Sequence, residues 1–208
     1  MKHLDLFSGI GGFALAASWA GIETVAFCEI EEFPRKVLRK NFPGVPIHRD
    51  IRELDGSEYE GIDLITGGYP CQPFSKAGKQ AGEEDDRHLW PEMFRVIKQA
   101  RPAWVVCENV TDHEYMGLDE VLTNLESEGY ATRPLIIPAG ALQRDHARER
   151  LWIIANHKRA GAKLEALADS GQERRSTNHK QPTLVSQRDW ASCAERVESS
   201  RVFFDRET

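Results

Sequence analysis

Short apolar runs alternate along this chain with amphipathic stretches, and no other feature constrains the fold as much. Strands are expected at His3–Phe7, Thr24–Cys28, Ile62–Thr66, Trp104–Cys107, Leu135–Ile137 and Leu151–Ala155. Helices are expected between several of them, at Gly12–Ala20, Glu32–Asn41, Pro91–Gln99 and Leu118–Glu126. Because each helix can return the chain to the start of a parallel strand, this order predicts an α/β fold with a doubly wound, mostly parallel, Rossmann-like sheet.

The pattern changes after Asn156, which divides the chain into two predicted parts. Residues 1–156 carry the alternation and are predicted to form one domain. Residues 157–208 begin with the polar stretch His157–Gln181, which is typical of a linker. Trp190, Cys193 and Val197 then recur at helical spacing, which favours a C-terminal helix.

Composition excludes several classes of protein. The N-terminus lacks the unbroken apolar run of a signal peptide and no segment is apolar enough to span a membrane, so a cytoplasmic protein is expected. The four cysteines form no CxxC pair, which indicates neither a disulfide framework nor a zinc site. A net charge of -6 argues against coating nucleic acid by bulk charge, although a local basic face remains open.

A glycine-rich turn joins the first strand to the first helix. Its backbone amides and the helix N-terminus can face a nucleotide-like ligand. The turn contains Asp5, Phe7, Ser8, Gly9, Ile10, Gly11 and Gly12. With Ala14 it also satisfies the relaxed dinucleotide fingerprint, so a dehydrogenase is one alternative at this point and a plain tight turn is another.

Two acids follow the next extended segments. Glu29, with Ile30 beside it, ends the second strand about twenty residues after the first glycine, where a carboxylate can accept hydrogen bonds from ribose hydroxyls. Asp50 and Ile51 follow a third short extended segment, where they could contact an adenine edge. Either acid alone is equally consistent with a solvated strand end, and only the link to the glycine turn favours ligand binding.

The segment Gly67–Ser75 is the most informative stretch. Pro70 and Pro73 flank Cys71 and restrict its backbone at the carboxyl edge of the sheet, where open α/β sheets bind ligands. Cys71 is therefore a candidate nucleophile, whereas Cys28 and Cys107 lie inside apolar strands and are expected in the core.

Further polar residues are expected at the same edge. Glu108 and Asn109 follow the strand that ends at Cys107, which places a carboxylate near Cys71. Arg148 and Arg150 enter the last strand at alternating positions, from which they can project on one side. A charged strand entry without function is the competing interpretation of the two arginines.

Together these motifs resemble, in order from about Leu4 to Ile154, those of the cytosine-C5-specific DNA methyltransferases. The resemblance implies the sheet of the S-adenosylmethionine-dependent methyltransferases. It also implies methyl transfer from S-adenosylmethionine to C5 of cytosine in double-stranded DNA. The stretch Ser75–Gly82, with Asp86 and Arg87, is similar to the mobile catalytic loop of that family, and Lys76 and Lys79 could contact phosphates there.

The resemblance also implies individual roles. Cys71 attacks C6 of a flipped cytosine, protonated Glu108 acts on N3, and Arg150 contacts O2, which makes Cys71, Glu108, Arg148 and Arg150 the catalytic candidates. The cofactor candidates are Asp5, Phe7, Ser8, Gly9, Ile10, Gly11, Gly12, Glu29, Ile30, Asp50, Ile51 and Pro70. The substrate candidates are Pro70, Gln72, Ser75 and Asn109, and no metal is expected.

The chain departs from the family pattern in two respects. His146 stands where the family usually has glutamine. No target-recognition domain of normal size and no closing Gly-Asn-rich motif follow Arg150, so a complementing chain is a candidate partner. The alternatives are a transfer-RNA cytosine methyltransferase, or a truncated fragment or subunit that binds the cofactor but is inactive without a partner; a dehydrogenase leaves Pro70–Phe74 and Glu108–Val110 unexplained.

Overall fold

The computed structural model describes residues 1–70, 89–111, 113, 117–139 and 148–157, all within one compact unit. Cys71, Gln72, Ser75 and His146 lie outside the described residues, as do the expected catalytic loop and the C-terminal part beyond His157. The predicted boundary near residue 156 therefore stays a prediction.

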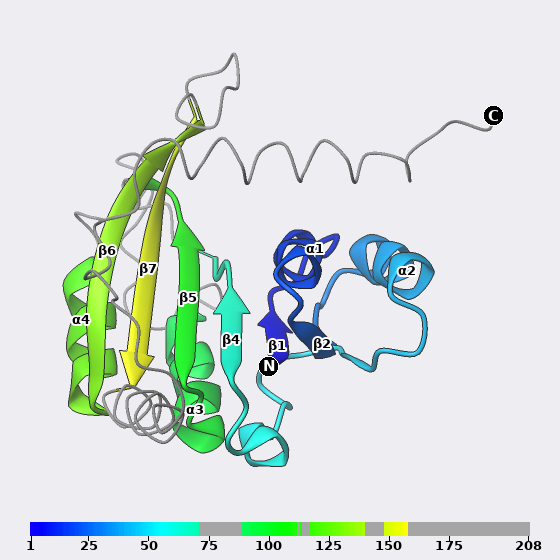
Figure 1. Cartoon of the computed structure of the whole chain (residues 1–208), viewed down its shortest axis with the longest axis horizontal. Helices are drawn as coiled ribbons and strands as arrows, with labels where there is room; N and C mark the ends of the chain where they lie inside the picture. Colours follow the sequence, from blue (N-terminus) through cyan, green and yellow to red (C-terminus); the bar gives the residue numbers. More distant parts are fainter. Residues whose placement is uncertain (71–88, 112, 114–116, 140–147, 158–208) are drawn as a thin grey trace, which may run out of the picture. The chain divides into compact units, whose positions relative to one another are not determined.

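The described residues form a seven-stranded sheet with helices (Figure 1). In chain order the elements are β1 (Lys2–Leu6), α1 (Gly12–Trp19), β2 (Glu23–Cys28), α2 (Glu32–Asn41), β3 (Ile47–His48), the 3-10 helix η1 (Gly56–Tyr59), β4 (Leu64–Gly67), α3 (Trp90–Ala100), β5 (Trp104–Asn109), α4 (Leu118–Ser127), β6 (Tyr130–Pro138) and β7 (Glu149–His157).

The strand order is β3-β2-β1-β4-β5-β7-β6. The strands from β3 to β5 pair in parallel, and β7 runs antiparallel to both of its neighbours. This confirms the doubly wound, mostly parallel sheet. The chain turns to one side of β1 through β2 and to the other through β4, so the topological switch point lies at β1.

Several strands differ in extent from the sequence expectation: β1, β2 and β4 by one or two residues at an end, and β5, β6 and β7 by running beyond their apolar runs. β6 runs from Tyr130 to Pro138, although only Leu135–Ile137 is an apolar run, because its other residues pair with β7 as an edge strand and need no apolar face. β5 continues through Glu108 and Asn109, which pair with Trp152 and Leu151 instead of following the strand. Pairing with β7 thus extends both strands beyond their apolar runs.

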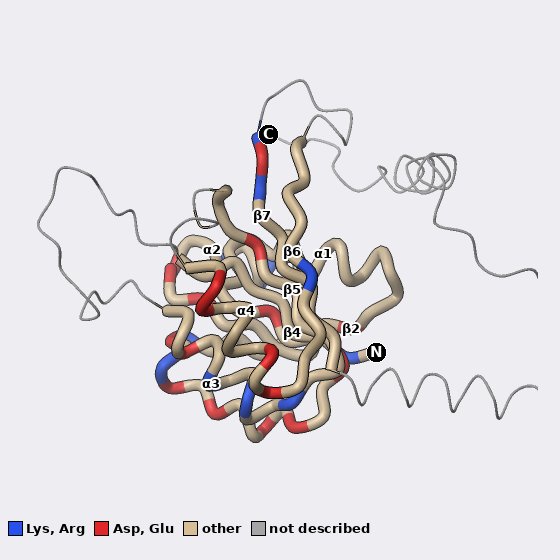
Figure 2. The backbone as a smooth tube through the Cα atoms, turned by 90° about the vertical axis from the view of Figure 1, so that its left-hand side faces the viewer, with Lys and Arg blue, Asp and Glu red and all other residues tan. Residues whose placement is uncertain are grey.

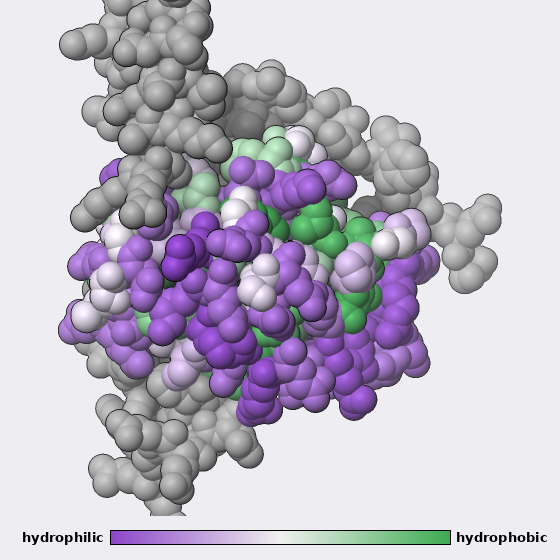
Figure 3. All heavy atoms as spheres, turned by 90° about the horizontal axis from the view of Figure 1, so that it is seen from below, coloured by the Kyte–Doolittle hydropathy of each residue, from purple (hydrophilic) through white to green (hydrophobic). Residues whose placement is uncertain are grey.

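Side-chain alternation along the strands separates two buried clusters. Ala26 and Cys28 of β2 belong to the larger cluster, which includes Met93 and Val96 of α3. Phe27 points the other way and packs with residues of α1 and α2. Helices therefore cover both faces of the sheet. The side of the molecular surface that Figure 3 shows is mostly hydrophilic, with small hydrophobic areas.

The parallel strands end at one common edge. Leu6 of β1 is in register with Cys28 of β2 and with Gly67 of β4, and Gly67 is in register with Cys107 of β5. The residues that follow these positions therefore emerge side by side. Most of the predicted site residues among the described residues lie at this edge.

Candidate active site

The glycine-rich turn after β1 has an unusual backbone. Phe7, Gly9 and Gly11 all have positive φ, at 53°, 52° and 93°. Such a conformation is strained for phenylalanine, and strain of this kind clusters at ligand sites. A Cβ at Gly9 would meet nothing within 4 Å, so the backbone at that position borders open space.

Ser8 shapes this turn from inside. Its side chain is buried, and its hydroxyl donates to the Asp5 carbonyl at 2.7 Å and to the Cys28 carbonyl at 3.3 Å. The Gly11 amide in turn donates to the Ser8 carbonyl at 2.9 Å. Ser8 thus fastens the turn to β1 and β2, and its contacts are structural.

Glu29 bridges the turn and the start of α2. Its Oε2 accepts from the Gly9 amide at 2.7 Å, and its Oε1 accepts from the Glu31 amide at 2.8 Å. Each carboxylate oxygen retains capacity for another hydrogen bond. The arrangement is compatible with ribose binding and also gives Glu29 a role in holding Gly9.

Asp5 is fully buried beneath the turn. The Thr66 hydroxyl donates to its Oδ1 at 2.7 Å, and its Oδ2 has no hydrogen-bond partner among the described residues. Burial raises the pKa of Asp5 to about 7; the Thr66 hydrogen bond acts in the opposite direction, nearby Glu29 contributes to the rise, and the nearby Ala14 amide opposes it. A buried unpaired carboxylate oxygen at a ligand edge invites a cationic or donor group.

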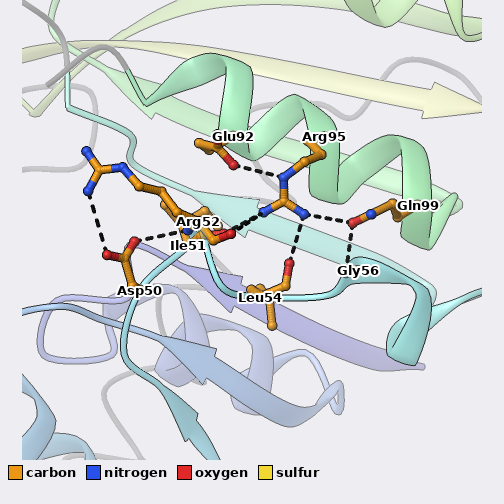
Figure 4. Close-up of polar contacts among 8 residues, drawn as sticks. All are labelled: Asp50, Ile51, Arg52, Leu54, Gly56, Glu92, Arg95 and Gln99. Carbon is orange, nitrogen blue, oxygen red and sulfur yellow. Dashed lines mark hydrogen bonds and ion pairs between the residues drawn. The ribbon is translucent and has the colours of Figure 1, made fainter. Parts of the chain in front are cut away.

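The loop that carries Asp50 and Ile51 is anchored to α3 (Figure 4). Arg95 donates to the carbonyls of Ile51 at 2.7 Å and Leu54 at 2.9 Å. The carboxylate of Asp50 accepts from the Arg52 amide at 3.0 Å and lies 3.6 Å from its guanidinium. Ile51 is buried, so its backbone and not its side chain is the part available to a ligand.

Glu108 of β5 faces Arg150 of β7. The Arg150 Nε lies 2.9 Å from Glu108 Oε1, and both side chains are about a quarter exposed, at 25% and 28%. A Cβ at Gly68 would lie 3.2 Å from Glu108 Oε2, so a glycine there leaves room beside the carboxyl group. Arg148 is exposed, and its carbonyl accepts from the Ala139 amide at 2.7 Å.

Tyr69, just before Pro70, is held on all sides. Its hydroxyl lies 2.7 Å from His113 Nε2, and its ring contacts that of Trp90 at 5.2 Å between centroids. The Asn109 side-chain amide donates to the Tyr69 carbonyl at 3.2 Å. Asn109 therefore acts on the backbone that leads to Cys71, while Pro70 itself is exposed.

The other described cysteines are core residues, as expected. Cys28 and Cys107 are buried free thiols. Burial raises the pKa of each to about 12, so neither supplies a thiolate at neutral pH. Cys28 also lies close enough to Asp50 and Glu29 for both carboxylates to raise its pKa, which brings these two predicted cofactor residues together.

The glycine-rich turn lies near the pair formed by Glu108 and Arg150. Phe13 of α1 contacts Trp152 edge-on at 5.8 Å between ring centroids, and Trp152 pairs with Glu108 in the sheet. Several residues that support the site were not among the expected site residues: Thr66, Tyr69, Arg95 and His113. Thr66 stands out in the sequence as a polar residue in an apolar strand and Tyr69 by its place in the Gly67–Ser75 segment, whereas Arg95 and His113 have no signal of this kind.

Taken together, an open α/β sheet has a strained glycine turn, a bridging acid and a second acid at its carboxyl edge, next to a carboxyl–guanidinium pair. This arrangement is typical of enzymes with a doubly wound sheet that bind nucleotide-like ligands. The profile of the C-5 cytosine-specific DNA methylases matches residues 1–201. The chain therefore belongs to the C-5 cytosine-specific DNA methylase family.

Individual relatives agree with this assignment. The chain is 46% identical to the Type II methyltransferase M.NgoMIV of Neisseria gonorrhoeae over 108 residues, which cover 51% of this chain and 35% of the relative. It is 32% identical to M.HhaI of Haemophilus parahaemolyticus over 159 residues, or 74% of this chain and 48% of the relative. The chain thus spans less than half of these curated relatives.

Solved structures share the fold. S. pombe Dnmt2 methyltransferase superposes with a TM-score of 0.63 at 24% identity, over 76% of this chain and 51% of that one. A mutant of Spodoptera frugiperda DNMT2 superposes with a TM-score of 0.65 at 25% identity, over 75% and 50%. Their sheet is the one seen here.

Among the described residues, no helix is long and apolar enough to cross a bilayer. Within the same residues, no group of three or more His, Cys, Asp or Glu side chains is arranged to hold a metal ion.

Proposed function

We propose that this chain is the catalytic part of a DNA cytosine-C5 methyltransferase that uses S-adenosylmethionine and attacks the base through Cys71. The observation that carries the proposal is the juxtaposition of Glu108 and Arg150 at the sheet edge that also bears the glycine turn. Family membership supports the same reaction.

The cofactor residues fit S-adenosylmethionine, which supplies an electrophilic methyl group when bound. Gly9 borders open space, Glu29 can accept from a ribose, and the unpaired Oδ2 of Asp5 suits a cationic group. The loop at Asp50 and Ile51 is braced from α3 and can offer a carboxylate and a backbone amide to an adenine edge.

Glu108 on β5 and Arg150 on β7 can together bind one edge of a cytosine. The guanidinium of Arg150 can donate to O2, and Glu108, when protonated, can donate to N3. Because the two groups are 2.9 Å apart, they can contact adjacent atoms of one pyrimidine ring. In a DNA duplex the cytosine is paired and stacked, and a side chain cannot reach these atoms. The nucleotide must therefore be flipped out of the duplex, at a cost of about a few kcal/mol.

The Cys71 thiolate would add to C6 while Glu108 supports protonation at N3, which makes C5 nucleophilic. C5 would then take the methyl group from the sulfonium, whose sulfur–methyl bond breaks so that S-adenosylhomocysteine leaves. A base removes the C5 proton, and elimination breaks the bond between Cys71 and C6 and returns the thiolate. Arg148 and Arg150 are the cations proposed to favour the thiolate.

Covalent trapping tests the nucleophile. An oligonucleotide with 5-fluorocytosine should form a stable adduct with the complete enzyme, this chain together with its complementing chain, in the presence of cofactor, because fluorine cannot leave as a proton would. The Cys71→Ala variant should form none, and Cys28→Ala should trap as well as the natural chain because Cys28 is buried. An adduct formed by Cys71→Ala would exclude the assignment.

Recognition of a defined DNA site is proposed to need a complementing chain. Major-groove reading requires a surface that contacts base edges, and the relatives that the chain matches are more than twice as long as their aligned parts. Acidic and basic residues are interspersed along the described backbone (Figure 2). Few phosphate contacts give weak, salt-sensitive binding.

Bisulfite sequencing tests this dependence. Plasmid DNA incubated with the chain and cofactor should gain no motif-specific methylation, whereas a polypeptide encoded immediately downstream should restore it. Robust methylation of one motif by the chain alone would refute the need for a partner. Methylation of transfer RNA but not of DNA would favour a transfer-RNA cytosine methyltransferase instead.

A further inference from the structure

A chain of hydrogen bonds crosses three strands beneath the cofactor turn. Thr24 of β2 lies 2.9 Å through Oγ1 from His3 Nδ1, and His3 Nε2 lies 2.7 Å from Thr66 Oγ1. The Thr66 hydroxyl then donates to Asp5 Oδ1 at 2.7 Å. The chain therefore links β2, β1 and β4 at the switch point and ends on the carboxyl group of Asp5.

The direction of donation along this series of hydrogen bonds is set by the carboxyl group of Asp5, which accepts. Because Thr66 gives its only hydroxyl proton to Asp5, its oxygen accepts from His3, and His3 must carry the proton on Nε2. The Nδ1 atom is then an acceptor, which receives the Thr24 hydroxyl proton. Every donor in the chain thus points towards Asp5.

The imidazole in this chain is neutral at physiological pH. His3 has 0% exposed surface, and desolvation by burial lowers its pKa to about 4. A neutral ring with one N–H matches the proton count that the chain requires. The imidazole therefore acts as a dipole in the chain and carries no charge.

We propose that His3 and Thr66 are positioning residues for cofactor binding, which orient the buried Asp5 carboxyl group beneath the glycine turn and stabilise its ionised form, so that its negative charge attracts the cationic amino group of the ligand. The proposal rests on the proposed use of S-adenosylmethionine. Neither residue is part of the glycine turn, and each acts only through Asp5.

A dependence on pH follows from this arrangement. The charged and titratable groups around Asp5 are Glu29 at the end of β2 and, through the hydroxyl of Thr66, His3 on β1; the Ala14 amide of α1 also lies near the carboxyl group. A cationic ligand favours the ionised carboxylate, so affinity should rise with pH through about 7, the pKa of Asp5 in the free chain, and then level off. Loss of the Thr66 hydrogen bond raises that pKa, so the rise should move to higher pH.

Calorimetry with S-adenosylhomocysteine, which carries the same amino group, tests the proposal on the full chain. The isosteric Thr66→Val variant should weaken binding at pH 7 about two- to fivefold, because an Asp5 pKa that is higher by about half to one unit leaves a smaller ionised fraction of the carboxyl group at that pH. It should also move the midpoint of affinity against pH upward by about half to one pH unit. Thr66→Ser should restore both, and His3→Phe should shift the midpoint in the same direction.

The possible results distinguish a failure of the positioning role from a failure of the proposed cofactor. If the natural chain binds no S-adenosylhomocysteine at any pH, the cofactor assignment is wrong and the positioning role falls with it. If the natural chain binds but the midpoint is the same in Thr66→Val, the positioning role alone is overturned. Titration of Asp5 by carbon-13 NMR in the free Thr66→Val chain must show the same upward shift, which a purely structural role would not produce.

Discussion

Replacing Arg95 with alanine should destabilise the protein because this side chain braces the loop at residues 51–54 (Figure 4). Alanine removes donors at 2.7 Å and 2.9 Å from the carbonyls of Ile51 and Leu54. A hydrogen bond from a charged group contributes about 1.5–3 kcal/mol. Since 32% of the Arg95 side chain is exposed, water can replace part of this, and we expect a total loss of about 2–4 kcal/mol.

Urea denaturation followed by circular dichroism measures this loss. With a typical denaturant slope for a domain of this size, the unfolding midpoint should fall by about 1–2 M. Arg39→Ala is the matched control, because its guanidinium is 57% exposed and its contact with Glu32 is long at 3.4 Å. It should change stability by less than about 0.5 kcal/mol.

The same variant should also bind S-adenosylhomocysteine more weakly, since the loop carries Asp50. Arg95→Lys keeps the charge but cannot reach both carbonyls, so it should recover less than half of the lost stability. An Arg95→Ala chain with the urea midpoint of the natural chain would refute the bracing role.

Two further predictions follow from the site. Gly11→Val should abolish S-adenosylhomocysteine binding in calorimetry, because φ is 93° and a Cβ would lie 2.7 Å from a ring carbon of Phe42; undiminished binding would show that the turn is not part of the pocket. The raised pKa of Asp5, about 7, makes stability fall as pH rises from 3.8 to 7, while the lowered pKa of His3, about 4, makes it rise from 4 to 6.5. In the Asp5→Asn variant only the His3 effect remains, so the free energy of unfolding should rise by up to about 1.4 kcal/mol per pH unit between pH 4 and 6.5. Urea titrations at several pH values measure this rise, and a free energy that does not change with pH would contradict the buried neutral imidazole.

Much of the fold was predictable because apolar runs and glycines report local structure directly. α2 was expected at Glu32–Asn41 and is found there, since its polar and apolar faces alternate with helical period. The antiparallel direction of β7 was not predictable, because strand direction depends on tertiary pairing. A reversed strand and a parallel one have the same apolar pattern.

The site residues likewise include some that the local sequence predicts and others that depend on tertiary contacts. Motif residues such as Glu29 and Glu108 could be placed at strand ends from the sequence, although their roles remain proposals. Arg95 contacts a residue more than 40 positions away along the chain, and His3 and Thr66 take part in contacts that span more than 60 positions. None of the three lies in a recognisable motif, so the sequence alone did not identify them. Long-range partners of this kind follow only from the register of the sheet.

The reversed direction of β7 has a consequence for dividing or fusing such enzymes. β7 brings Arg150 to the edge where the parallel strands end and then carries the chain away, so that His157 ends beside Ala103, to whose carbonyl its amide donates at 2.9 Å. A module joined after His157 would start at the opposite edge, about 23 Å from Arg150 at roughly 3.3 Å per strand residue. A cut there would remove none of the seven described strands. A gene could therefore be split at this position, with the recognition module supplied in trans, and the catalytic sheet would remain whole.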